Sequence, residues 1–410
     1  MASPSDACPV PSAAEIRRAA FSGLAANLIG IGLARFGYTP LLPALVSARW
    51  FTESAAAYLG AANFAGYLAG ALVARALIRR IATATVLRAM MALVAASLFA
   101  CALRDLGFAW FFLWRLASGL AGGVIMVLAA PAVLVATPVA RRGWVGGIIF
   151  TGVGLGVAAS GTLVPLLLRL GGLVGAWVGL GALALLLTAY GWSGWPAFAA
   201  VPHPAAGARP NARALGPVGL LVTALLAEYA LNAVGLVPHM LFLVAYVARG
   251  LDRGLDAGAA YWVLYGIGAL AGPLVAGRLG DRIGFAAALR LALLVEAVAV
   301  ALPAISTDAR SLALSSLIAG AMTPGIVPIA LGRIHELVPD AALQGRCWSH
   351  ATTAWALAQA LAGYACARAL TTAGSYALLF SLGACALLAA LFLELATSVR
   401  RPVASARSAD

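Results

Sequence analysis

Twelve long runs of apolar residues, separated by short polar segments, dominate the pattern of this 410-residue chain. Each run is close to the roughly 20 residues that a helix needs to cross the hydrocarbon core of a membrane. The runs cover residues 18–46, 54–77, 83–103, 108–137, 144–168, 173–195, 216–248, 259–279, 285–305, 311–332, 346–370 and 376–398. This pattern predicts an all-α polytopic membrane protein with twelve transmembrane helices.

A proline-rich stretch divides the runs into two sets of six. Five prolines lie within residues 196–217, which is too many for a helix. We therefore expect two six-helix halves joined by a linker. The predicted parts are a cytoplasmic N-terminal tail (1–17), a first bundle (18–195), a cytoplasmic linker (196–215), a second bundle (216–398) and a cytoplasmic C-terminal tail (399–410).

Composition supports a membrane location. Hydrophobic residues make up 63% of the chain and charged residues only 10%, so a soluble domain would lack the polar atoms to cover its surface. The net charge of +13 would suggest a nucleic-acid partner for a soluble protein. Here the arginines lie in short segments between apolar runs, so we expect no nucleic-acid partner and a surface in contact with the lipid bilayer.

The distribution of arginine sets the expected topology. Of the 27 arginines, eighteen fall on the side of the N-terminus and seven on the opposite side, which leaves Arg35 and Arg115 inside the membrane. Because short loops rich in arginine stay in the cytoplasm, we expect both termini there. The expected location is the inner membrane of a bacterium, crossed many times by a monomer.

Several enzyme chemistries are excluded by residue usage. The chain contains no lysine, so it has neither a Walker lysine for a nucleotide phosphate nor a lysine for a Schiff base. Its five cysteines are scattered, without the spacing of a metal site. Gly152, Gly154 and Gly156 lie in an apolar run without a preceding strand, so close helix packing explains them better than nucleotide binding. We expect no enzyme activity, no cofactor and no metal.

Arg35 is the most informative polar residue within the apolar runs. An ionisable side chain in the bilayer is costly unless it is paired or hydrated, so it marks a candidate pathway residue. Asn27, Tyr38 and Thr39 share the side of an ideal helix on which Arg35 lies. This polar stripe predicts a watery cavity beside the first helix. The alternative is that Arg35 caps carbonyls that the following prolines leave unpaired.

The seventh run carries a second polar stripe. On an ideal helix, the side chains within about 60° of its centre are Glu228, Tyr229, Asn232, Gly235 and His239. A carboxyl at the place of Glu228 can release its proton when an arginine approaches, as a proton-coupling site requires. The alternative is a carboxyl that stays protonated and bonds to a neighbouring helix.

Three further polar residues lie within the runs. Gln359 shares a helix face with Trp355, and it is the better candidate for a binding role because an unpaired amide in hydrocarbon is costly. Arg115 follows two tryptophans that mark a membrane interface, so a structural and a functional role both stay open. Glu296 is central in the ninth run, where we expect a packing role.

The segment between the eighth and ninth runs is Gly-Arg-Leu-Gly-Asp-Arg-Ile-Gly, residues 277–284. It resembles the loop motif G-x-L-x-D-R-x-G of the major facilitator superfamily. In the first half, the equivalent segment carries Ala74 in place of the aspartate, so we expect a gating ion pair to depend on Asp281. The predicted gating residues are Gly277, Asp281, Arg282 and Gly284.

Within this superfamily, residues 35–43 (Arg-Phe-Gly-Tyr-Thr-Pro-Leu-Leu-Pro) resemble the first helix of the YbfB/YjiJ-type transporters. Residues 63–72 resemble their second helix. Arg115 and Gly119 resemble the R-x-x-x-G motif of the fourth helix, which is associated with the transport cycle in proton-coupled relatives. The resemblance covers nearly the whole chain and implies the major facilitator fold and secondary transport, without naming a substrate.

We therefore expect a secondary active transporter that moves a small solute with protons, by rocking two halves about a central site. Arg35 suggests uptake or exchange of a small organic anion, and export of amphipathic compounds is the alternative. The predicted substrate-binding residues are Arg35, Tyr38, Thr39, Asn63, Tyr67, Asn232 and Gln359, and the predicted proton-coupling residues are Glu228 and Arg115.

Overall fold

A computed structural model of the protein describes residues 12–138, 141–196 and 218–399. Every regular element in these residues is a helix, as the apolar runs predict. The first helix begins at Ala13, so residues 13–17 of the predicted tail are helical. Most of the predicted linker and the ends of both predicted tails lie outside the described residues.

The α-helices differ from the apolar runs mainly in length, because their ends extend beyond the apolar core of each span. They are α1 (Ala13–Asn27), α2 (Tyr38–Ser47), α3 (Glu53–Leu77), α4 (Thr83–Ala100), α5 (Gly107–Val135), α6 (Arg142–Gly191), α7 (Val218–Val237), α8 (Leu243–Ala245), α9 (Gly254–Ile283), α10 (Phe285–Ile305), α11 (Ala309–Leu337), α12 (Ala341–Ala373) and α13 (Tyr376–Val399). A short 3₁₀ turn, η2 (Arg104–Leu106), precedes α5.

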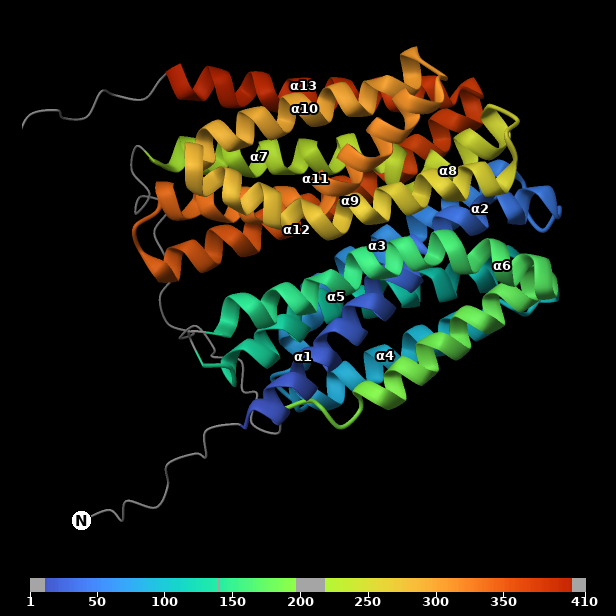
Figure 1. The fold of residues 1–410 in the computed structure, drawn as a ribbon, viewed down its shortest axis with the longest axis horizontal. Coiled ribbons are helices and arrows are strands. Elements are labelled where there is room, and N and C mark those ends of the chain that lie inside the picture. Colours follow the sequence, from blue (N-terminus) through green and yellow to red (C-terminus); the bar gives the residue numbers. More distant parts are fainter. Residues whose placement is uncertain (1–11, 139–140, 197–217, 400–410) are drawn as a thin grey trace, which may run out of the picture.

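Ten helices among the described residues are long and apolar enough to cross a membrane, whereas the sequence predicts twelve. Two elements account for the difference. One is α6, which contains non-helical backbone at Gly171 and Gly172, where the chain reverses direction (Figure 1). Only glycine readily adopts the conformation of Gly172, whose φ is 60° and ψ is −158°. The other is α12, whose 33 residues include polar side chains that lower its hydropathy.

Two long helical stretches depart from regular α-helix near their middle. In the first, Ala13–Ser47, a π-helical segment η1 (Leu28–Phe36) joins α1 to α2. In the second, Gly219–Gly250, the π-helical segments η5 (Pro238–Phe242) and η6 (Tyr246–Gly250) flank α8. Pro238 lacks an N–H for the α-helical ladder. π-helical turns often mark functional sites. We therefore expect the functional site near these two stretches.

Glycines let the helices approach one another closely. A Cβ added to Gly32 would lie 2.5 Å from the Cα of Gly156, which joins η1 to α6. Gly152 lies against the carbonyl oxygen of Leu24, and Gly154 against Leu270 of α9. The expectation that the glycines of residues 152–156 serve helix packing is confirmed.

The same kind of contact joins α3 to α5 and α9 to α11. Gly66 and Gly70 of α3 lie against backbone carbonyl oxygens of α5, and Gly119 and Gly123 of α5 lie against carbonyl oxygens of α3. In the second half of the chain, the corresponding contacts are made by Gly268 and Gly272 of α9 and Gly320 of α11. Small residues at a spacing of four are typical of membrane helices in close contact.

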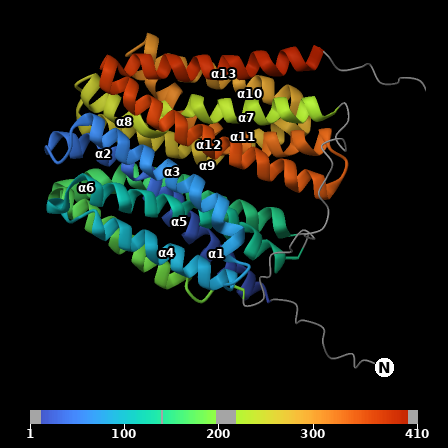
Figure 2. The same cartoon turned by 180° about the vertical axis from the view of Figure 1, so that it is seen from behind.

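We call the end of the bundle where α1 begins and α13 ends the terminal end, and the opposite end the far end. Figures 1 and 2 show α1–α6 grouped on one side and α7–α13 on the other, with the two groups diverging toward the terminal end. Polar contacts join the groups at the far end. They are Arg169–Asp256 at 2.5 Å, Arg249–Glu53 at 3.8 Å, Arg249–Ser47 at 3.3 Å, Thr371–Ser54 at 2.7 Å and Tyr376–Glu53.

The predicted hinge at residues 277–284 is mostly helical. Helix α9 continues through Asp281 and Arg282, which are exposed, and ends at Gly284 with a φ of 80°. The described residues show no ion pair between these two side chains. A Cβ at Gly277 would meet nothing within 4 Å, so this glycine makes no close backbone contact. Gly284 is the residue that ends the helix, because it adopts a positive φ without strain.

We predict that Gly272→Ala destabilises the protein while Gly345→Ala does not. A Cβ at Gly272 would overlap the backbone of Ala321 in α11, whereas a Cβ at Gly345 would meet nothing within 4 Å. Overpacking of this kind costs about 1–3 kcal/mol, and α9 would have to move away from α11. Thermal unfolding in detergent would measure the difference. Equal unfolding temperatures for the two variants would contradict the packing described here.

Candidate substrate and proton sites

Arg35 lies at the end of η1, buried between the two groups of helices with 6% of its surface exposed. Its guanidinium carbon lies 4.6 Å from the ring centre of Phe64 and 5.1 Å from that of Tyr67, both on α3. The ring centres of Phe36 and Trp355 lie 5.3 and 5.7 Å away. None of the ion pairs formed by the described residues includes Arg35. The cation is therefore held by aromatic faces and not by a carboxylate.

Met240, in η5 of the seventh span, connects both halves at this level. Its sulfur lies 3.7 Å from Nη2 of Arg35 and 3.0 Å from Nε2 of Gln359, and its carbonyl oxygen accepts a hydrogen bond of 2.6 Å from Thr39. Three predicted substrate residues, Arg35, Thr39 and Gln359, thus contact one unpredicted residue, and a fourth, Tyr67, contacts Arg35. We call Arg35, Phe64, Tyr67, Met240, Trp355 and Gln359 the central cluster.

Two other predicted substrate residues belong to a second group around Arg115. Nη1 of Arg115 donates to the carbonyl oxygen of Ala34 at 2.5 Å, and its guanidinium lies 4.2 Å from the ring centre of Tyr38. The Tyr38 hydroxyl donates to the carbonyl oxygen of Ala56 at 2.7 Å. Asn63 donates to Ser118 of α5 at 3.0 Å. These contacts hold η1, α3 and α5 together.

Arg115 is more buried than its place after two interface tryptophans suggests. Only 2% of the surface of Arg115 is exposed, so the side chain turns into the bundle and does not extend to the membrane interface. Its hydrogen bonds to carbonyl oxygens satisfy several guanidinium donors. Arg115 therefore bonds inside the bundle, and its proton-coupling role stays a prediction.

Asn232 points away from the central cluster, into the second half of the chain. Its Nδ2 donates to Oε2 of Glu296 on α10 at 2.5 Å, and both residues are fully buried. His239 lies 2.7 Å from the Ser315 hydroxyl, which itself donates to the carbonyl oxygen of Ala299. Because that hydroxyl has a single proton, Nε2 of His239 must be the donor of this pair. Both pairs connect α7 or η5 to its neighbours.

Glu228 is also buried, but both of its carboxylate oxygens lack a hydrogen-bond partner among the described residues. Its strongest charged neighbours are Glu394, Arg333 and Arg290, from α13, α11 and α10. Arg290 lies 3.3 Å from Glu394 in this structure, and Arg333 lies 2.9 Å from Glu336. Glu228 therefore lies beside two arginines that are each paired with another carboxylate.

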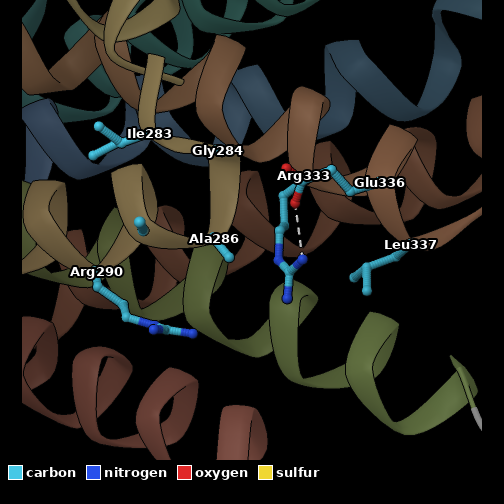
Figure 3. Close-up of a pocket in the computed structure, with 8 residues that line it drawn as sticks. Ile283, Gly284, Ala286, Arg290, Arg333, Glu336 and Leu337 are labelled. Carbon is cyan, nitrogen blue, oxygen red and sulfur yellow. Dashed lines mark hydrogen bonds and ion pairs between the residues drawn. The ribbon is translucent and has the colours of Figure 1, made fainter. Parts of the chain in front are cut away.

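A pocket of about 460 Å³ opens beside these arginines at the terminal end. Ile283, Gly284, Ala286, Ala287, Arg290, Arg333, Glu336 and Leu337 line it. Figure 3 shows the side chains of Arg290 and Arg333 extending toward α7 from two different helices. Oε1 of Glu336 accepts from the backbone N–H of Phe285 at 2.9 Å, which fixes the loop after α9. The pocket thus brings space and positive charge close to Glu228.

Sequence reasoning missed Met240, Phe64, Arg290 and Arg333. Met240 and Phe64 are apolar residues in apolar helices, so only their partners reveal them. Arg290 and Arg333 are two of the eighteen arginines that the topology places on the side of the N-terminus, outside the membrane. A helical wheel could have placed both on faces that point inward, but not toward the same residue of α7.

Comparisons with known proteins agree with this architecture. Residues 27–395 match the family described as "Uncharacterised MFS-type transporter YbfB". Among solved structures, the chain is similar to a D-xylose–proton symporter, with a TM-score of 0.70, 17% identity, and 92% of this chain and 96% of that chain covered. It is also similar to a mutant form of the nucleoside transporter NupG, with a TM-score of 0.73, 14% identity, and coverages of 92% and 99%. No curated protein matches the chain in sequence.

The family match spans most of the chain, from η1 to α13, and includes the central cluster. The resemblance to YbfB-type transporters is therefore confirmed. The similar solved structures show the same fold at low sequence identity. The chain belongs to the YbfB family of major-facilitator-type transporters, and it is a multi-pass membrane carrier and not an enzyme.

Proposed function

We propose that the protein is a proton-coupled secondary transporter that carries a small solute by alternating access. The observation that carries this proposal is the central cluster. There, hydrogen-bond donors from both halves of the chain meet near the middle of the membrane, and the Arg35 guanidinium has no carboxylate partner among the described residues. A buried charge of this kind is costly unless a ligand or water reaches it. Two structural neighbours, a D-xylose–proton symporter and a nucleoside transporter, support the class.

In this proposal the chain forms twelve membrane helices in two halves of six, residues 18–195 and 216–398. The break in α6 supports two spans within that element, and α12 supplies another. The repeated glycine contacts of α3 with α5 and of α9 with α11 support two similar halves. The distribution of arginine supports a terminal end in the bacterial cytoplasm.

The described state is closed on the side away from the cytoplasm. The five polar contacts at the far end join the halves there, and the ribbons diverge at the terminal end. Each contact is partly exposed, and exposed ion pairs contribute little to stability. They are therefore suited to breaking during a transport cycle, when the halves rock to open the far end.

Of the two buried carboxyls Glu228 and Glu296, we propose Glu228 as the proton carrier. Glu296 bonds to Asn232, and a proton on its free oxygen could bond to the free carbonyl oxygen of that amide. This pair is self-sufficient and buried. Glu228 has no such partner, and it lies beside a pocket and two arginines that could leave their present partners. Exchange of Arg290 between Glu394 and Glu228 would release the proton.

We predict that a cysteine at position 67 can be labelled from both sides of the membrane. Alternating access exposes the central cluster to each side of the membrane in turn. A receptor that does not transport would expose it to one side at most. The test uses Tyr67→Cys in a background without native cysteines, with a membrane-impermeant maleimide added to right-side-out or inside-out vesicles. Labelling from a single side would contradict alternating access.

A cross-link supplies the matched control for this experiment. Ser54 and Thr371 are in hydrogen-bond contact across the far end, so cysteines there should form a disulfide, which requires Cβ atoms about 3.5–4.5 Å apart. In the triple variant, oxidation should block labelling of position 67 from the outside only, and reduction should restore it. If oxidation leaves outside labelling unchanged, the far end is not the gate.

We predict that Glu228→Gln removes the pH dependence of this labelling. The wild-type side chain gains or loses a proton as the buffer changes from mildly acidic to mildly alkaline, and the equilibrium between the two open states shifts with it. The glutamine cannot titrate. Glu296→Gln is the control, because its carboxyl is paired with Asn232. Persistent pH dependence in Glu228→Gln would remove this residue from the coupling step.

A further inference from the structure

The central cluster has an excess of hydrogen-bond donors over acceptors. Nε of Arg35 and Nε1 of Trp355 are buried without any partner, and Nη2 of Arg35 and Nε2 of Gln359 both point at the sulfur of Met240. A thioether is a weak acceptor. Three side chains from the first and eleventh spans thus contribute donors to the cluster, and Oε1 of Gln359 is a buried oxygen there that also lacks a partner among the described residues.

The central cluster also carries a positive charge that no negative charge balances. Arginine stays protonated in proteins, and no carboxylate pairs with Arg35 among the described residues. The buried carboxyls of α7 and α10 have their charged or polar neighbours elsewhere, at Arg290, Arg333 and Asn232. One positive charge is therefore uncompensated, and an anion is the ligand that would compensate it.

Ring faces surround this charge. Phe64 and Tyr67 approach the guanidinium from α3, and Trp355 approaches it from α12. The Trp355 ring is held in turn by Tyr229, at 6.2 Å between ring centres. Gly363 lets α12 lie directly against Phe64. A flat, apolar group fits between flat rings better than a bulky or a hydroxylated one, because stacked rings gain dispersion and quadrupole energy.

We propose that the carried solute is a small planar monocarboxylate with an aromatic ring. Its carboxylate accepts hydrogen bonds from Arg35, Gln359 and Trp355 in place of the Met240 sulfur, and its ring lies against Phe64 and Tyr67. A dicarboxylate fits less well, because the second buried cation, Arg115, already donates to the carbonyl oxygens of Ala34 and Leu59. This inference rests on the proposed transport function for the movement of the solute, but binding itself is measurable without transport.

Benzoate is the probe that tests the proposal. Binding to the purified full-length protein in detergent would be measured by tryptophan fluorescence and by calorimetry. Benzamide keeps the shape and removes the charge, and cyclohexanecarboxylate keeps the charge and removes the flat ring. Benzoate should bind saturably, and each analogue should bind about tenfold more weakly or worse, because one of the two recognised features is missing.

Variants locate the binding site. Arg35→Gln should weaken benzoate binding about tenfold or more, and Trp355→Leu should also weaken it while leaving Arg35 in place. Arg88→Gln and Trp114→Phe are the controls, because Arg88 bonds to the carbonyl oxygen of Trp192 and Trp114 packs against Trp110, both outside the central cluster. Both controls should bind benzoate as the wild type does.

Three results would overturn the proposal. They are the absence of saturable benzoate binding, equal binding of benzoate and benzamide, and full binding by Arg35→Gln. The labelling of position 67 separates this failure from failure of the transport proposal. Labelling from both sides without benzoate binding would support a carrier whose solute is not an aromatic monocarboxylate. Labelling from one side only would reject the transport proposal, whether or not benzoate binds.

Discussion

Close contact between helix backbones is the constraint on which the rest of this structure depends. In hydrocarbon there is no hydrophobic force to drive one apolar helix against another, so packing has to come from surfaces that fit closely. Glycines supply that fit between η1 and α6, between α3 and α5, and between α9 and α11. With these contacts in place, the first span becomes the most buried part of the molecule, and its polar side chains must find partners inside the protein.

Those buried polar groups divide into satisfied and unsatisfied ones. Arg115, Asn63 and Asn232 bond to carbonyl oxygens, a hydroxyl or a carboxyl, and they connect neighbouring helices. Nε of Arg35 and both carboxylate oxygens of Glu228 have no hydrogen-bond partner among the described residues, whereas Asn63 and Asn232 each leave only one oxygen unpaired. In a dry interior an unsatisfied charge is expensive, so its retention is the best structural indication of a ligand. The two unsatisfied groups have opposite charge and different neighbours, which suits one to an anionic solute and the other to a proton.

The contacts at the two ends of the molecule differ in kind. At the far end, short polar side chains and exposed ion pairs join the halves. At the terminal end, a pocket with two arginines opens between α10 and α11. Glycines give close backbone contacts within each group of helices and also between α6 and α9, where Gly154 and Gly266 lie against the other helix.

The sequence by itself determined the class of the protein, the positions of the helices and the list of buried polar residues. Length and hydropathy suffice for these, because a bilayer accepts few other backbone structures. It also identified the glycines of residues 152–156 as packing residues. Tertiary structure alone decided which polar residues meet. On an ideal wheel Tyr38 shares a helix face with Arg35, and Asn232 shares one with Glu228. Yet Tyr38 bonds to Ala56 and Asn232 bonds to Glu296, because their partners come from other helices, and η1 changes the helix geometry between Arg35 and Tyr38. Met240 belongs to the cluster for the same reason, which no pattern in an apolar run can show.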